Sequence, residues 1–152
     1  MSLHDTIDAE LRTAMKARDR DRMSALRMAI SELKNRAVAD GLGPQGRLDD
    51  TVVIQVLTTE VKRRREAAQA FADAGRSEQA DRESAEAALY EQFLPAQLAD
   101  EELAAIVDRV VRQVGAEGPS AMGQVMKPVM AEVAGRADGA RVSALVRDRL
   151  RA

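Results

Sequence analysis

Three basic residues near the carboxyl end of the chain have the types and spacing needed to contact phosphate. Lys127, Arg136 and Arg141 flank the segment 135–139, Gly-Arg-Ala-Asp-Gly, which precedes a candidate helix. Glycines let a backbone approach a ligand closely, and the free N–H groups at a helix N-terminus attract anions. The same pattern is also typical of an ordinary turn followed by a helix cap. The segment therefore predicts either a phosphate-binding turn or a simple connection.

A second basic cluster, Lys-Arg-Arg-Arg, occupies positions 62–65. Four successive helical residues spread over about 300° of the helix circumference, so they cannot share one face. Arg64 falls on the apolar side of the helix predicted there, with Glu60 four residues before it. We expect Lys62, Arg63 and Arg65 to form either a solvated exterior or further phosphate contacts.

Other kinds of site chemistry lack the residues they need. The chain has no cysteine and one histidine, His4, which we expect to be a solvated surface residue beside the N-terminus. A catalytic triad, a histidine-rich metal site and a thiolate site are therefore excluded. The glycine segments match neither a nucleotide-binding P-loop nor a dinucleotide fingerprint. We predict no catalytic residue, no metal site and no cofactor.

The composition favours a helical protein without a strong overall charge. Of 152 residues, 45% are hydrophobic, 32% are charged and only 2% are aromatic, which is typical of helices rather than sandwiches or barrels. Lys and Arg number 15 against 17 Asp and Glu up to residue 96, and 8 against 8 beyond it. A polyanion site would thus have to be a local patch. With no signal peptide and no apolar run of about 20 residues, we expect a cytoplasmic protein without membrane contact.

Apolar residues at helical spacing predict four helices in the first half of the chain. The stripe that predicts the first helix consists of Leu3, Ile7, Leu11 and Met15. The expected N-terminal caps of the next three helices are Asp19 or Asp21, Asp49 or Asp50, and Ser77.

The segment 90–98, Tyr-Glu-Gln-Phe-Leu-Pro-Ala-Gln-Leu, divides the chain. Pro95 disfavours helical geometry at Leu94, so a helix should end here, and the acids at 100–102 should open the next one. We expect both aromatics of the segment, Tyr90 and Phe93, to pack in a core. We therefore predict an N-terminal helical domain of residues 1–95 and a C-terminal domain of residues 96–152.

The second half predicts three short helices. The first ends at Gly115, and Ser120 and Asp138 are the expected caps of the next two. Pro128 lies inside the middle helical pattern, where it should kink or restart the helix. No alternation of period two appears, so we predict no strand. The predicted fold class is all-α, with an N-terminal four-helix part joined to a C-terminal three-helix bundle.

Several short motifs, in this order and spacing, resemble the YqeY family and the C-terminal tail of the aminoacyl-tRNA amidotransferase B subunit. The resemblance covers nearly the whole chain. Its residues are Ala14-Met15-Lys16-Ala17, Arg27-Met28, Leu33-Lys34-Asn35, Lys62-Arg63-Arg64, Ala74-Gly75-Arg76, the segment 90–98, Met122-Gly123-Gln124-Val125-Met126-Lys127, and Gly135-Arg136-Ala137-Asp138-Gly139.

The resemblance implies an all-helical, tRNA-binding accessory protein of translation, related to the enzyme that amidates Glu-tRNA(Gln) or Asp-tRNA(Asn). Carried over position by position, it implies a tRNA-contacting surface in the C-terminal part, composed of Lys127, Gly135, Arg136, Asp138 and Arg141. It does not extend to the catalytic region of the B subunit, so we expect no catalysis by this chain alone.

Two other functions remain open at the level of sequence. The near-neutral charge of both halves is compatible with a helical adaptor that binds an amidotransferase or an aminoacyl-tRNA synthetase. By family analogy alone, the chain could instead be a carbon–nitrogen ligase with glutamine as the amido donor. The sequence does not determine the oligomeric state.

Overall fold

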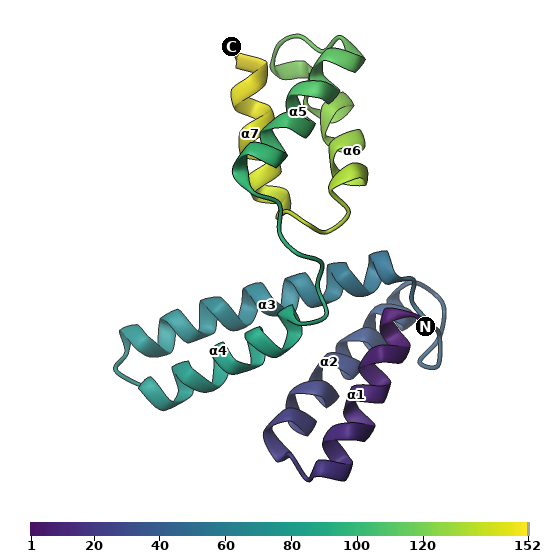
Figure 1. Cartoon of the computed structure of the whole chain (residues 1–152), viewed down its shortest axis with the longest axis vertical. Helices are drawn as coiled ribbons and strands as arrows, with labels where there is room; N and C mark the ends of the chain where they lie inside the picture. The colour runs from purple at the N-terminus through teal and green to yellow at the C-terminus, as the bar shows by residue number, and fades with distance from the viewer. Residues whose placement is uncertain (152) are drawn as a thin grey trace. The chain divides into compact units, whose positions relative to one another are not determined.

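The structure, a computed structural model, describes residues 1–151, which form seven α-helices, one short 3₁₀ turn and no strand (Figure 1). The predicted all-helical fold is confirmed. The helices fall into two compact units, residues 1–94 and the residues from Pro95 onward. Whether each unit is an independent domain stays a prediction. The elements are α1 (Leu3–Ala17), α2 (Arg20–Ala39), α3 (Asp50–Asp73), α4 (Ser77–Glu91), α5 (Asp100–Val114), η1 (Pro119–Ala121), α6 (Met122–Val133) and α7 (Gly139–Arg151).

Helix α1 starts at a capping box and buries one stripe. The Ser2 hydroxyl accepts a hydrogen bond from the Asp5 N–H, and the Asp5 carboxylate accepts one from the Ser2 N–H. Ile7 and Ala14 are buried, whereas Met15 is 48% exposed, so the predicted stripe is wrong at its last member. Steps of four residues drift about 40° each on a helix of 3.6 residues per turn. After three steps Met15 has left the core, and Ala14 takes its place.

His4 is buried, which corrects the expectation that it lies solvated at the surface. Leu48, in the loop between α2 and α3, folds back onto α1, and its N–H donates to Nδ1 of His4 at 3.4 Å. Burial, and next the charge of Arg47, lower the pKa of His4, while Asp8 and Asp5 act in the opposite direction. The covering loop is 44 residues away in sequence, so the local pattern around His4 could not reveal it.

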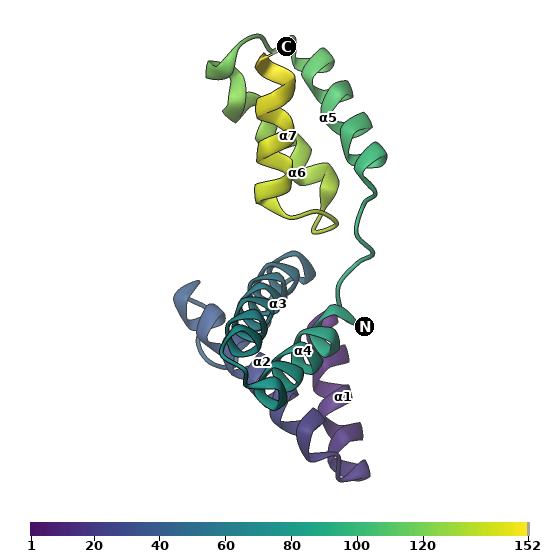
Figure 2. The same ribbon diagram turned by 90° about the vertical axis from the view of Figure 1, so that its left-hand side faces the viewer.

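Helices α3 and α4 form an antiparallel hairpin, lying side by side in both views (Figures 1 and 2). Gly75, with φ of +75°, makes the left-handed turn between them. Ser77 was predicted as the cap of α4 but is its first helical residue, and Arg76 occupies the cap position. The reason is that the Arg76 N–H closes the end of α3, at 2.8 Å from the Phe71 carbonyl, which leaves no further residue between the helices.

Tyr90 joins α4 to α2 in the core of the first unit. Its ring is fully buried, and its hydroxyl donates to the Ala25 carbonyl at 2.7 Å. Burial raises the pKa of Tyr90 to about 12, so the hydroxyl stays protonated and able to donate. Phe93 is half-buried against the same core. The other large core residues of this unit are Ile7, Leu26, Leu33, Val53 and Leu57.

The second unit packs α5, α6 and α7 around a core rich in valine. Its α5 begins with the Ala99 N–H donating to the Glu102 carboxylate at 3.2 Å, and it ends at Gly115 as predicted. The fully buried members of this core are Val107, Val125, Val129, Val133, Val142 and Val146. Valines of this size let three short helices approach one another closely while burying apolar surface.

Two details of α6 differ from the predictions. Ser120 does not cap it: Ser120 lies within the 3₁₀ turn η1, and Ala121 holds the cap position. Pro119 at the first position of η1 favours this tight turn. Ser120 is part of the turn and therefore does not stand at the start of α6. Pro128 does not restart the helix, because α6 runs unbroken from Met122 to Val133. The missing N–H would have bonded the carbonyl of Gln124, which is an exposed residue.

Two kinds of feature are absent from residues 1–151. None of the helices there has both the length and the apolar character that a bilayer crossing requires. The same residues contain no group of three or more histidine, aspartate or glutamate side chains placed to hold a metal ion.

Candidate nucleic-acid interface

The turn between α6 and α7 reverses the chain through two successive left-handed residues. Ala134 has φ of 48° and Gly135 has φ of 82°. Glycine adopts this conformation without the steric penalty that a side chain adds, so the second left-handed position is well suited to it. The Arg136 N–H then bonds the Val133 carbonyl at 3.0 Å. The predicted segment 135–139 is therefore a real, tightly closed turn.

Arg136 directs its guanidinium back onto the end of α6. Nε donates to the Val133 carbonyl at 3.0 Å, and a terminal nitrogen donates to the Glu132 carbonyl at 2.9 Å. A cation here also suits the negative end of the helix dipole. Arg136 thus supports the turn, and only its remaining N–H groups can reach a ligand.

Asp138 and Arg141 stand at the start of α7. The Asp138 carboxylate accepts from the Ala140 N–H at 2.9 Å, so Asp138 caps α7 as predicted. Arg141 pairs with Asp100 at the start of α5, with 2.5 Å between nitrogen and oxygen. The Asp100 side chain is 93% exposed. An anion can therefore displace Asp100 from Arg141 at small cost, because exposed ion pairs contribute little.

The residues that precede α5 lie against the same turn. The Leu98 N–H donates to the Arg136 carbonyl at 2.7 Å, and the Gln97 amide donates to the Gly135 carbonyl at 3.4 Å. These bonds satisfy the Gly135 and Arg136 carbonyls of the turn. The end of the second unit formed by residues 97–100 and 135–141 is therefore one connected surface, which we call the C-terminal surface.

Lys127 is on α6, outside that turn. It is exposed and lies six residues before Val133, the last residue of α6, which corresponds to about 9 Å along the helix axis. The ion pair that α6 makes within the described residues uses Glu132, paired with Arg109, whose hydrogen bond lowers the pKa of Glu132. The structure brings Gly135, Arg136, Asp138 and Arg141 together. Lys127 lies apart from them, near the middle of α6.

The basic cluster on α3 divides between the two sides of the helix. Arg64 points inward, with its side chain only 19% exposed. Arg63 pairs with Glu60 at 3.0 Å, and Arg65 pairs with Glu91 on α4 at 2.9 Å. Lys62 is exposed. Arg63 and Arg65 are thus already compensated by carboxylates, and Lys62 has the most freedom to meet a phosphate.

A model of the family described as Yqey-like protein matches residues 4–150 of the chain. The chain belongs to this family. The resemblance that the sequence motifs indicated is confirmed, and the shared region includes both structural units.

A shorter stretch of this Yqey-like chain is similar to a protein of tRNA-dependent amidation. Over 57 residues it is 46% identical to the E subunit of the glutamyl-tRNA(Gln) amidotransferase of Thermococcus gammatolerans. The match covers 35% of this chain and 9% of that relative. The Yqey-like chain is therefore related to a small region of an amidotransferase subunit.

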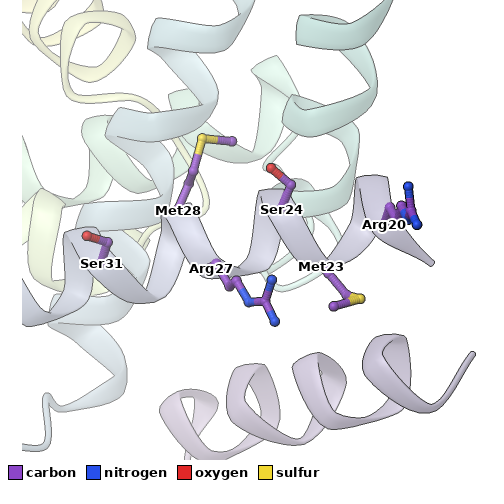
Figure 3. Close-up of a pocket in the computed structure, with 6 residues that line it drawn as sticks. All are labelled: Arg20, Met23, Ser24, Arg27, Met28 and Ser31. Carbon is purple, nitrogen blue, oxygen red and sulfur yellow. The ribbon is translucent and has the colours of Figure 1, made fainter. Parts of the chain in front are cut away.

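One exposed surface of the Yqey-like chain was missed by sequence reasoning. It follows the outer side of α2, where a shallow hollow of about 550 Å³ lies along the helix (Figure 3). Its lining residues are Arg20, Met23, Ser24, Arg27, Met28 and Ser31. Basic residues seven apart on one helix were the available signal, but neighbouring Asp19 and Asp21 made the start of α2 resemble an ordinary mixed-charge face.

Proposed function

We propose that this chain is a tRNA-binding accessory protein, non-catalytic by itself, that acts together with a tRNA-dependent amidotransferase. The observation that carries the proposal is the 46% identity to a segment of an amidotransferase subunit named for glutamyl-tRNA(Gln). Because that segment is 9% of the relative, the shared property is expected to be one of binding rather than of the whole reaction.

The C-terminal surface supports this proposal through its donors. At the start of α7, Arg141 is held by an exposed carboxylate, while the Ala140 N–H is already bonded to the Asp138 cap. Lys127 adds an exposed cation on α6. Contacts of this type hold a phosphate backbone without reading its bases, so we expect binding to a tRNA body with little dependence on sequence.

The state of the single imidazole supports a non-catalytic role. His4 is buried, and its Nδ1 accepts a hydrogen bond from Leu48. With no cysteine in the chain, neither a thiol nucleophile nor an exposed imidazole base is available for acyl transfer.

The test is binding of fluorescently labelled tRNA to the full chain at 50 and 200 mM salt. We expect affinity to fall steeply with salt, since each neutralised phosphate adds about 0.7 to 0.9 to the slope of log K against log salt. The double variant Lys127→Ala, Arg141→Ala should lose about tenfold at low salt. Arg136 is kept, because its guanidinium supports the turn.

A matched control removes two cations from elsewhere in the second unit. Arg112→Ala with Arg149→Ala makes the same change in charge near the C-terminal ends of α5 and α7. Equal losses of tRNA affinity in both double variants would mean that only net charge matters. If the wild-type chain did not bind tRNA at 50 mM salt, the proposal would be contradicted.

The adaptor function remains the second candidate, because Arg63, Arg65 and Arg141 are already paired with carboxylates. It predicts that an amidotransferase or a synthetase co-purifies with the tagged chain while tRNA does not. The same pull-down, scored for protein and RNA together, separates the two functions.

A further inference from the structure

The outer side of α2 carries a row of cations that form no ion pair with a carboxylate within residues 1–151. Arg20, Arg27 and Lys34 are spaced seven residues apart, and Ser24 and Ser31 lie between them. All five are exposed. Their spacing alternates four and three residues, so they line one side of the helix over about 21 Å. We call this row the α2 outer face.

The positions at which a carboxylate could pair with these cations hold other residues. Counting three and four residues in each direction within α2, the neighbours of Arg20, Arg27 and Lys34 are methionine, serine, isoleucine, alanine and valine. The ion pairs that α2 makes within residues 1–151 use Arg22 and Arg36 instead. Charged helix exteriors normally alternate in sign, so a row of one sign marks a surface for an anionic partner.

The acidic residues of α2 lie beside the row rather than within it, and Asp21 lines a hollow together with Ser24. Asp21 follows Arg20, and Glu32 follows Ser31, so each turns about 100° away from the row. Glu32 lines a different hollow, shared with residues of α3. None of these acids forms an ion pair with Arg20, Arg27 or Lys34 within residues 1–151.

Two methionines flank the cations, one on each side of α2. In Figure 3, Met23 and Arg27 point to one side of α2, toward α1, and Met28 and Ser24 point to the other. Both methionines are only partly exposed. The hollow is thus lined mostly by apolar side-chain atoms, with guanidinium groups and serine hydroxyls along it.

These features favour a nucleic-acid backbone over a protein partner. Protein interfaces centre on large buried anchors, commonly aromatic, and contain few lysines and serines, although methionine and arginine are common in them. The α2 outer face has no aromatic residue, and its central Arg27 lies between two serines. Arginine, lysine and serine are instead the side chains that donate to phosphate oxygens. Successive cations about 10 Å apart reach different phosphates, because the rise per nucleotide is about 3.4 Å along one strand.

We propose that the α2 outer face is a second RNA-binding surface, in the first structural unit, at which Arg20, Arg27 and Lys34 contact phosphates and the two serines donate between them. This inference rests on the proposed function, which supplies tRNA as the RNA. It adds a binding surface in the first unit to the one expected in the second. Such contacts position the RNA and do not read its sequence.

The experiment measures binding of labelled tRNA to three variants of the full chain by fluorescence anisotropy across a salt series. The triple variant Arg20→Ala, Arg27→Ala, Lys34→Ala should bind at least tenfold more weakly at 50 mM salt. Its slope of log K against log salt should fall by about two, the share of three phosphate contacts. Circular dichroism should show unchanged folding, because the three side chains are exposed.

Two further variants separate the row from overall charge. Arg76→Ala, Arg112→Ala, Arg151→Ala also removes three exposed cations and should change affinity less than threefold. Arg20→Lys with Arg27→Lys keeps the positive charge and should also stay within threefold, since lysine binds phosphate as a point charge and backbone binding depends on neutralised charge. A competition arm uses poly-glutamate of matched charge, which should displace tRNA poorly.

Each outcome decides the inference. If the chain binds tRNA and the α2 triple variant binds as wild type, the α2 surface is refuted while the proposed function stands. Equal loss in the Arg76, Arg112, Arg151 variant would refute it as a net-charge effect. Stronger binding of poly-glutamate than of tRNA would replace RNA with an acidic protein as the occupant. Wild-type chain that binds no tRNA would overturn both proposals.

Discussion

At the scale of single residues, charge and hydrogen bonding in this protein depend on partners that are distant in sequence. His4 illustrates this, because its pattern of neighbours resembles a solvated terminus while its ring is covered by Leu48. The hydrogen bond from the Leu48 N–H requires an unprotonated Nδ1. Burial and the hydrogen bond therefore both favour the neutral ring, which is consistent with the lowered pKa of His4.

Stability should fall when His4 is forced to take up a proton. A base whose pKa is lower in the folded state binds more protons when unfolded, so stability rises with pH through this range and is lost as pH falls below about 6.5. Between pH 7.5 and 5.5 this single group contributes at most about 1.4 kcal/mol. Urea unfolding at both pH values should show the loss in wild type and a smaller loss in His4→Asn, whose side-chain oxygen can still accept from Leu48.

Carboxylates also titrate in this interval, so the informative quantity is the difference between the two proteins. Asp5, Asp8 and Arg47 surround the ring and remain in both. An identical pH dependence in wild type and His4→Asn would show that His4 does not contribute.

At the scale of helices, an inward-pointing charge joins α3 to α4. Arg64 lies 3.3 Å from Glu60 on its own helix and 3.1 Å from Glu86 on α4, with Glu83 at 3.7 Å. Burial, and next the charge of Glu83, raise the pKa of Glu86, against the effect of Arg64. Arg64 is thus the ion-pair partner of both α4 carboxylates, Glu83 and Glu86. Glu60 is shared between Arg64 and Arg63.

Removal of that guanidinium should loosen the hairpin. Arg64→Met keeps most of the side-chain volume and leaves the carboxylates facing each other, which we expect to cost about 3 kcal/mol in the free energy of unfolding. The loss should be smaller at pH 5 than at pH 7.5, because a carboxyl with a raised pKa gains a proton first and protonation relieves the repulsion. Urea unfolding at both pH values measures this.

Arg65→Met is the matched control, since Arg65 is on the same helix and also pairs with α4, but at the surface. Its loss should stay below about 1 kcal/mol. Comparable losses for the two variants would mean that Arg64 acts as an ordinary surface charge.

The helices themselves were predictable from sequence, and their ends were only partly so. Asp19 and Asp138 cap α2 and α7 as expected, because an aspartate before a helical stripe has one dominant local use. The predictions that Ser77 and Ser120 cap α4 and α6 were wrong. Tight turns at Gly75 and Pro119 directly precede these serines, so other residues stand at the cap positions. A cap motif predicts a start only where the preceding turn leaves room.

At the scale of the whole molecule, the sequence motifs pointed to the α6–α7 turn but not to the state of its cations. Spacing placed Arg136 and Arg141 beside the turn, whereas their partners, the carbonyls of α6 and Asp100, depend on the folded structure. The α2 outer face was not predicted from the sequence. What distinguishes it is that no acid stands three or four residues from its cations within α2. A linear scan for basic clusters does not detect such a surface.

Each of the two units closes a core of its own, and this leads to the last prediction. The first core cluster draws its buried members from between Ile7 and Tyr90, and the second from between Leu98 and Leu150. No buried member of one cluster belongs to the other. A chain cut after Leu94 therefore removes no buried residue from either cluster, and both fragments should fold.

Fragment 1–94 should show a helical circular dichroism spectrum and a cooperative melt, and fragment 95–152 should do the same at a lower temperature. The second fragment has 58 residues, close to the size at which a core just offsets chain entropy. The two spectra should add up to that of the full chain. A cut after Lys62, inside α3, is the control: it divides the first core and should give an N-terminal fragment without a cooperative melt. If fragment 95–152 stayed unfolded while the full chain melted as one unit, the second unit would depend on the first, and tRNA binding by the C-terminal surface would have to be studied only in the intact chain.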